Sequence, residues 1–170
     1  MRRRHPVPTL WLMTDERMGD ALWDAVRRLP GGTGIVFRHH ATPPAERRRL
    51  FARLLRIARA HGLVLVRAGE QRMAGEMGVH RGRSHQLVTW PVHDGREAKS
   101  ARRARADVAF VSPVFPTRSH PGAPSLGKRR AERLARTLPM VRVALGGMDG
   151  RRFRALHGFD GWAAIDAWMR

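Results

Sequence analysis

The sequence predicts an α/β fold, a (β/α)8 barrel that occupies residues 1–170 as a single domain. Short apolar runs alternate with helical patterns along the whole chain, and we count eight such runs. Strands separated mostly by helices favour a parallel sheet, and eight parallel strands close most economically into a barrel. An open flavodoxin-like sheet is the alternative, but it would need fewer strands. At 170 residues the chain is shorter than the roughly 200 residues typical of such barrels, so we expect a trimmed one.

The eight expected strands are apolar runs bounded by Gly, Pro, Asp or His. They lie at residues 10–13, 34–37, 63–66, 78–80, 86–90, 108–111, 140–145 and 161–165. Short continuous apolar runs are typical of strands that are covered on both faces, as in parallel sheets.

Apolar residues at helical spacing predict the connecting helices. These lie at residues 20–28, 43–60, 94–105, 128–138 and 149–156. Thr42 is expected to cap the longest helix, and Asp94 with Glu97 forms a capping box. The stretch after the third strand holds at most a stub of helix, and the stretch after the fourth has no room for one. The barrel is therefore predicted to have these two helices reduced or absent.

The composition favours an anionic partner. Lys and Arg number 33 against 14 Asp and Glu, a net charge of +19, but the arginines are scattered along polar helix faces. Most of them are therefore expected to be solvated surface, and a basic nucleic-acid-binding protein is an alternative that rests on charge alone. The absence of cysteine excludes disulfides and thiolate metal sites. No apolar run approaches the roughly 20 residues of a membrane span, so we expect a cytoplasmic protein without membrane association.

Several segments carry a family resemblance. They are residues 12–15 (LMTD), 78–82 (GVHRG), 91–93 (PVH), 106–117 (ADVAFVSPVFPT), 124–127 (PSLG) and 143–148 (VALGGM). In order and spacing they resemble the thiamine-phosphate synthase family, and the PVFPT segment is the most specific. The resemblance implies a TIM barrel that binds its ligands at the C-terminal ends of the strands, where barrel active sites lie in general.

The resemblance also implies a role in thiamine biosynthesis. Members of this family join an aminopyrimidine diphosphate to a thiazole phosphate and release pyrophosphate with the help of magnesium. A related branch isomerises the thiazole phosphate by proton transfer, without a metal. The function expected here is binding of thiazole phosphate, with the aminopyrimidine diphosphate as a further ligand. A non-catalytic or isomerase-like relative that binds thiazole phosphate without metal is the alternative. The expected partners are small phosphorylated metabolites, and a homodimer is left open.

Departure of pyrophosphate builds negative charge on oxygen, so the site needs cations and backbone N–H groups. Arg38 matches the arginine that the family places at the end of its second strand, while the family's glutamine and lysine nearby are replaced by Val36 and His40. Glycines let the backbone approach an anion closely. The residues that we expect to bind phosphate are Arg38, Thr117, Arg118, Ser119, Gly146 and Gly147. For Arg38 the alternative is a salt bridge.

The magnesium ligands of the family are aspartates that follow strands three and four. The matching stretches contain Arg67 and Arg83 and no carboxylate, and arginine repels a metal ion. We therefore assign no metal ligands and no definite cofactor, with magnesium left open by the resemblance alone. The histidines could form a rim at the barrel mouth, but none has the spacing of a zinc site.

His93 is the candidate catalytic residue. It ends the fifth strand, directly before a capped helix, and a histidine at this match is the acid/base of the isomerase-like branch. Imidazole exchanges protons near neutral pH, which suits this task. The alternative is a histidine hydrogen-bonded to the helix start. We expect His80 to be structural, Asp15 to cap the segment after the first strand, and Asp166 to disfavour a nearby phosphate unless it points away.

Overall fold

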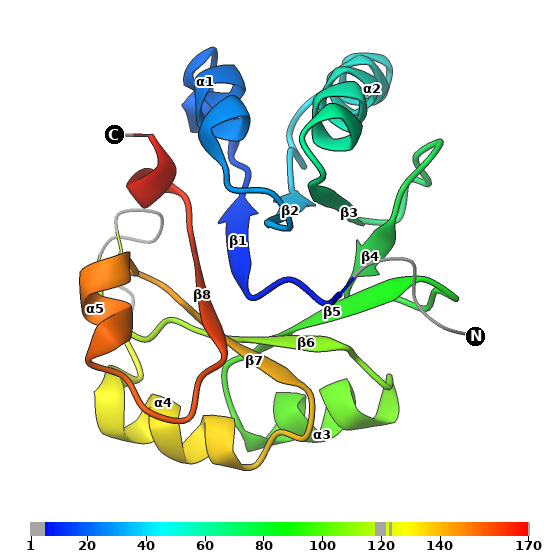
Figure 1. The fold of residues 1–170 in the computed structure, drawn as a ribbon. Helices are drawn as coiled ribbons and strands as arrows, with labels where there is room; N and C mark the ends of the chain where they lie inside the picture. The colour runs from blue at the N-terminus through cyan, green and yellow to red at the C-terminus, as the bar shows by residue number, and fades with distance from the viewer. Residues whose placement is uncertain (1–5, 118–121, 123, 170) are drawn as a thin grey trace.

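The computed structural model describes residues 6–117, 122 and 124–169, and its eight parallel strands form a closed barrel (Figure 1). Each strand pairs with the next, and β8 pairs with β1 to close the ring. The strands are β1 (Leu10–Met13), β2 (Gly34–Phe37), β3 (Val64–Ala68), β4 (Gly78–His80), β5 (Leu87–Val92), β6 (Val108–Val111), β7 (Val141–Leu145) and β8 (Gly161–Ala164). The predicted (β/α)8 barrel is confirmed.

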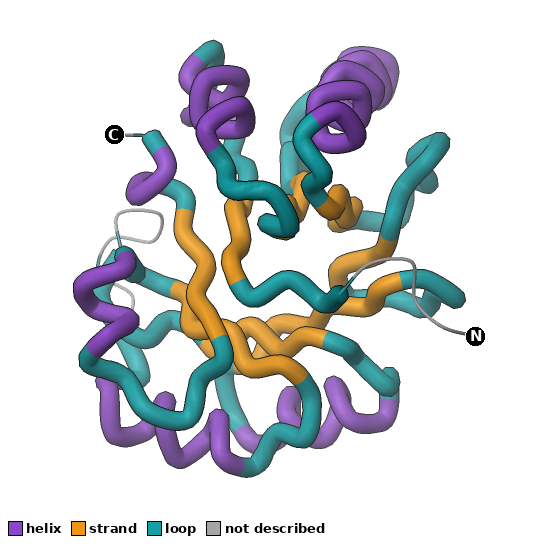
Figure 2. Tube along the Cα trace, in the orientation of Figure 1, coloured by secondary structure: helices purple, strands orange, loops and turns teal. Residues whose placement is uncertain are grey.

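The helices lie on the outside of this ring. They are α1 (Ala21–Arg28), α2 (Pro44–Ala60), α3 (Gly95–Arg103), α4 (Gly127–Arg136) and α5 (Gly150–Arg154), with short 3-10 helices η1 (Glu16–Met18) and η2 (Asp166–Trp168). The connections from β3 to β4 and from β4 to β5 are described throughout and contain only loop, as Figure 2 shows in teal. The prediction that these two helices are reduced or absent is confirmed.

Two strands are longer than their apolar patterns indicate. β3 continues through Arg67 to Ala68 because these residues pair with Val79 and His80 of β4. β5 continues to Val92, which pairs with Val111 of β6. Backbone pairing, which the apolar pattern does not report, therefore sets the length of both strands.

The predicted cap of the longest helix is wrong. Pro43, not Thr42, occupies the N-cap position of α2 and makes no side-chain cap bond. The hydroxyl of Thr42 instead faces the Glu16 carboxylate, with Oγ1 and Oε1 3.5 Å apart. The caps expected from Asp94 and Asp15 are present: Asp94 accepts from the Glu97 N–H, and Asp15 from the Arg17 N–H.

Large side chains fill the barrel interior. The indole of Trp11 packs edge-on against Phe110 with ring centroids 5.2 Å apart, and both residues are fully buried. The indole lies directly over Gly34 of the neighbouring strand, where a Cβ atom would overlap the ring. Its Nε1 donates to the Pro8 carbonyl, so the residues that lead into β1 hold the ring from below. The interior is therefore a packed core, as is typical of this architecture.

A second apolar cluster lies outside the barrel wall. Residues of β4 to β7 that face outwards, such as Val92 and Ala109, pack with alanines of α3 and α4. None of the helices within the described residues combines the length and hydropathy that a membrane-spanning segment requires.

Candidate functional site

The carboxyl ends of all eight strands lie at one face of the barrel because the strands are parallel. The predicted site residues that the structure describes follow these ends. Arg38 follows β2, His93 follows β5, Thr117 lies in the loop after β6, and Gly146 with Gly147 follows β7. Arg118 and Ser119, also predicted to bind phosphate, lie outside the described residues.

A cavity of about 300 Å³ opens between the loops that follow β6, β7 and β8. It brings together Thr117, Gly146 and Gly147, three of the residues predicted to bind phosphate. The remaining lining residues that matter for charge are Asp149, Arg152 and Asp166. Neither Arg38 nor His93 lines this cavity. The predicted site residues therefore lie in two places, this cavity and the rest of the barrel mouth.

The glycine pair has a conformation and surroundings that exclude larger residues. Gly146 and Gly147 have φ angles of 95° and 59°, in the region that favours glycine. A Cβ atom on Gly146 would lie 2.7 Å from Pro113, and one on Gly147 would meet the Pro116 carbonyl oxygen. The Phe115 N–H donates to the Gly146 carbonyl at 3.1 Å. The backbone after β7 is therefore held tightly against the loop after β6, at the wall of the cavity.

Arg152 is a cavity residue that the sequence analysis missed. Its Nη1 donates to the Gly147 carbonyl, and its guanidinium lies 5.2 Å from the Phe115 ring centroid. Its own N–H donates to the Asp149 carboxylate at 2.8 Å, which caps α5. The available signal was an arginine three residues after the capping aspartate. That signal is weak because Arg151 and Arg154 flank it with the same charge.

Asp166 also lines the cavity. It lies close enough to Arg17 to contribute to the raised pKa of that guanidinium, after the larger effects of the hydrogen bond and charge of Asp15. Asp166 therefore has a basic neighbour in Arg17, as Asp149 has in Arg152.

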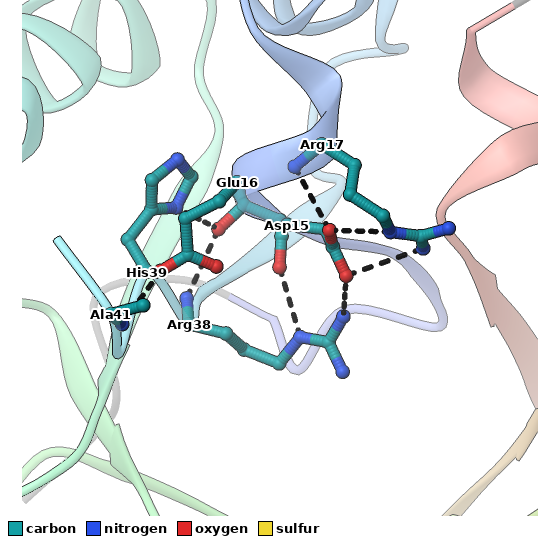
Figure 3. A network of polar contacts seen from close by, with 7 residues as sticks. Asp15, Glu16, Arg17, Arg38, His39 and Ala41 are labelled. Carbon is teal, nitrogen blue, oxygen red and sulfur yellow. Dashed lines mark hydrogen bonds and ion pairs between the residues drawn. The ribbon is translucent and has the colours of Figure 1, made fainter. Parts of the chain in front are cut away.

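Arg38 takes part in an ion-pair network across the ends of β1 and β2 (Figure 3). Its Nε donates to the Thr14 carbonyl at 2.9 Å, and its Nη2 lies 3.3 Å from the Asp15 carboxylate. Arg17 approaches the same carboxylate from the other side, with Nε at 2.8 Å. Burial lowers the pKa of Arg38, partly offset by the charge of Asp15. Of the two roles that the sequence left open for Arg38, the ion pair is present.

The same network controls the charge of Asp15. Burial alone would raise the pKa of Asp15, but the hydrogen bonds from Arg17 and the charges of Arg17 and Arg38 outweigh it. The pKa is therefore lowered, and the carboxylate stays ionised at neutral pH. A ligand phosphate would have to share Arg38 with this carboxylate.

His93 forms a close pair with Glu97 at the start of α3. Its Nδ1 lies 2.6 Å from Glu97 Oε2, and its backbone N–H donates to the same oxygen at 2.7 Å. The hydrogen bond from the Glu97 N–H is the main cause of the lowered pKa of Asp94. The Glu97 carboxylate accepts from the His93 N–H, whereas in a regular capping box it would accept from the N–H of the N-cap residue, Asp94. Half of the His93 side chain stays exposed, which leaves Nε2 available.

His80 lies inside the barrel beneath the mouth. Its Nδ1 is 2.8 Å from Thr89 Oγ1, and its ring lies 5.7 Å from that of Phe110. Burial lowers its pKa to about 3, and the charges of Arg38, His40, Arg81 and His93 add to the effect. A neutral histidine therefore lies below a mouth surrounded by cationic groups.

The stretches that match the family's magnesium ligands contain no carboxylate. Among the described residues, no three His, Asp or Glu side chains are grouped closely enough to hold a metal. Arg67, in the stretch that matches one of the family's metal ligands, forms an ion pair with Glu76 at 2.6 Å between Nε and Oε2. That pairing occupies the Glu76 carboxylate of the β3–β4 loop.

Comparisons with known proteins agree on one family. The family model described as thiamine monophosphate synthase matches residues 55–168. A thiamine-phosphate synthase from Methanobrevibacter smithii is 32% identical over 76 residues, which cover 44% of this chain and 36% of the relative. The matched region thus spans about a third of that relative's length.

Solved structures share the fold. The thiamine phosphate pyrophosphorylase from Pyrococcus furiosus superimposes with a TM-score of 0.79 at 23% identity, over 95% of this chain and 87% of that one. The YdjI aldolase from Escherichia coli K12 gives a TM-score of 0.63 at 11% identity, over 94% and 76%. Identities this low support the barrel fold alone.

Proposed function

Because the chain belongs to the thiamine monophosphate synthase family, we propose that it binds a thiazole phosphate in the cavity between the loops after β6, β7 and β8. The observation that carries the proposal is the convergence of Thr117, Gly146, Gly147 and Arg152 on one cavity of about 300 Å³. A hydroxyl, glycine backbone and a guanidinium are groups that hold phosphate oxygens. The positive φ angles of the glycines allow the close approach that such a ligand needs.

Binding is proposed to need no metal. The stretches that match the family's magnesium ligands contain Arg67 and Arg83 and no carboxylate, and Arg67 already pairs with Glu76. Positive charge for the phosphate comes instead from Arg152, which the Gly147 carbonyl and the Phe115 ring hold in place. An arginine held on two sides loses little conformational freedom when it binds an anion.

The aminopyrimidine diphosphate, the second expected ligand, has a less favourable site. Arg38 is the residue expected to bind it, and this guanidinium already contacts Asp15 and the Thr14 carbonyl. A diphosphate at Arg38 would lie close to the Asp15 carboxylate, whose negative charge opposes binding. Binding of thiazole phosphate without synthesis is therefore favoured over the complete synthase reaction.

The pair of His93 and Glu97 favours a second function, metal-independent isomerisation of the bound thiazole phosphate. An ionised Glu97 can only accept, so the proton of the imidazole resides on Nδ1 and Nε2 is the basic nitrogen. Nε2 would accept a proton from one carbon of the thiazole and return a proton at another, leaving the formula unchanged. This requires the ring to extend from the cavity across the mouth towards His93.

Titration calorimetry with thiazole phosphate, with and without magnesium, tests the proposal. We expect saturable binding whose affinity is the same in both buffers. A parallel turnover assay separates an isomerase from a binding protein. Binding that requires magnesium would overturn the metal-free proposal, and the absence of binding in both buffers would overturn the ligand assignment.

A further inference from the structure

The outer wall of the barrel has an uncovered groove where the helix between β4 and β5 is missing. In Figure 1, α2 and α3 flank the part of the ring that contains β4, and only loops lie between them. A cavity of about 600 Å³ opens there. We call it the β4–β5 groove, and the residues that define it are Arg83, His85, Val88, Trp90, Arg103 and Arg105.

The floor of this groove is the outer face of β5. Thr89 faces His80 inside the barrel, so its neighbours Val88 and Trp90 point outwards, because side chains alternate along a strand. Val88 is buried and Trp90 only partly buried, and both belong to the apolar cluster that α3 and α4 cover elsewhere. α3 packs against β5 and Val88 is buried, so the partly exposed Trp90 supplies the apolar surface that stays open where the helix after β4 is missing.

The rim of the groove is cationic. Arg83, Arg103 and Arg105 are exposed, as is His85. One carboxylate, that of Asp107, is part of the lining, and it accepts a hydrogen bond from the Val88 N–H at 2.9 Å. The Asp107 carboxylate thus holds the backbone at the start of β5 by a hydrogen bond, and the charge that the groove presents to a partner is positive.

The positive charge of the rim favours an acidic partner over a second copy of this chain. A second copy of the chain would bring a further +19 against the arginines of the rim, and like charges at an interface are unfavourable. An acidic partner would instead be attracted, and a partly exposed tryptophan beside arginines is typical of an interface anchor. Helices follow β1, β2, β5, β6 and β7 on the outside of the barrel, so a helix matches the shape of the vacant position.

We propose that the β4–β5 groove binds an acidic amphipathic helix of a partner protein. Apolar residues of that helix pack on Trp90, and its carboxylates pair with Arg83, Arg103 and Arg105. The partner thereby takes the place of the helix that the chain lacks after β4. This inference is independent of the phosphate cavity.

A synthetic peptide tests the proposal on the full chain. The probe is a fluorescently labelled helical peptide with leucines at positions i, i+3, i+4 and i+7 and glutamates elsewhere, and the readout is its anisotropy. Arg103→Glu in the last turn of α3 should weaken binding by about tenfold. Arg133→Glu makes the same change in the last turn of α4, away from the groove, and should alter affinity by less than about twofold.

Further measurements distinguish binding in the groove from general attraction between opposite charges. Trp90→Ala, checked for folding by circular dichroism, should also weaken binding, and a peptide of scrambled sequence should bind more weakly than the amphipathic one. Equal losses in the Arg103 and Arg133 variants would overturn the proposal. Two other results would also overturn it. Oligothymidine that binds more tightly than the peptide, and is weakened equally by Arg103→Glu, would assign the groove to nucleic acid. A dimer that Arg103→Glu dissociates would assign the groove to a second copy of the chain.

Discussion

The imidazole of His80 shares a hydrogen bond with the hydroxyl of Thr89, and Nδ1 and Oγ1 lie 2.8 Å apart between neighbouring strands of the barrel. Burial, with added repulsion from the cations of the mouth, lowers the pKa of His80 from 6.5 to about 3. The ring is therefore neutral in the folded protein over most of the acidic range. In the unfolded chain it binds a proton once the pH falls below its ordinary pKa.

This difference predicts a loss of stability in mild acid. Above pH 6.5 the ring is neutral in both states, so His80 has no effect on the pH dependence there. Below it, the unfolded state binds the extra proton, and the free energy of unfolding falls by about 1 kcal/mol per pH unit. We expect a decrease of about 1–2 kcal/mol between pH 6.5 and pH 5, measured by urea denaturation.

His80→Gln separates this contribution from that of other histidines. Glutamine does not titrate and can still reach the Thr89 hydroxyl. The pKa values of His39 and His40 are also lowered, chiefly by burial, so the variant keeps part of the acid sensitivity. Its stability should nevertheless fall less steeply with pH than that of the unchanged protein. Parallel curves for the two proteins would show that the folded His80 titrates normally.

Arg105, just after α3, has a φ angle of 50°, which is strained for a residue with a side chain. Glycine is the residue usually found at this position after a helix. Arg105→Gly should therefore raise the free energy of unfolding by about 1 kcal/mol. Lys99→Gly, in the middle of the same helix, is the control and should lower it by about 1 kcal/mol. A loss of stability in both variants would contradict the strain.

Gly34 is required by the packing of Trp11. A Cβ atom on Gly34 would overlap the indole ring, which Phe110 prevents from moving into the barrel centre. Gly34→Ala should lower the free energy of unfolding by about 1–3 kcal/mol, as overpacked cores do. Gly95→Ala, at a helical position with open space, should change stability little or raise it slightly. Thermal melts of the two variants compare them directly, and equal melting temperatures would refute the overlap.

The contact between His93 and Glu97 predicts how substitutions at these residues change kcat. If the protein isomerises thiazole phosphate, Glu97→Gln should lower kcat by about tenfold or more while KM changes little, because the carboxylate orients the imidazole. His93→Gln should lower kcat further. The pH profile of kcat is the second readout, and a Glu97 variant with an unchanged profile and rate would limit Glu97 to capping the helix.

The sequence was sufficient for the order of the elements because buried parallel strands form continuous apolar runs. The bounds of β1, β2, β4 and β6 agree with the predicted runs. It did not predict where β3 ends, because Arg67 looks like a loop residue until its partner Glu76 is brought back beside it. Likewise nothing near Pro43 indicates that Thr42 lies against Glu16, which is distant in sequence.

The sequence predicted the part of the site whose residues directly follow a strand. Gly146 and Gly147 follow a strand directly, so their place at the cavity wall follows from the fold. The contact of Arg38 with Asp15 depends on the pairing of β1 with β2, and the sequence alone left the role of Arg38 open. Arg152 was missed because the chain is rich in arginine, and only the folded structure distinguishes the one that contacts Gly147 from its neighbours.

Calorimetry of two arginine variants with thiazole phosphate tests the cavity most directly. Arg152 lines the cavity, whereas Arg151 beside it in α5 is exposed and does not. Arg152→Ala should weaken binding by about tenfold or more, because a charge-assisted hydrogen bond to the phosphate is lost. Arg151→Ala should leave the affinity within about twofold of the unchanged protein. Equal affinities in both variants and the unchanged protein would contradict the assignment of the cavity.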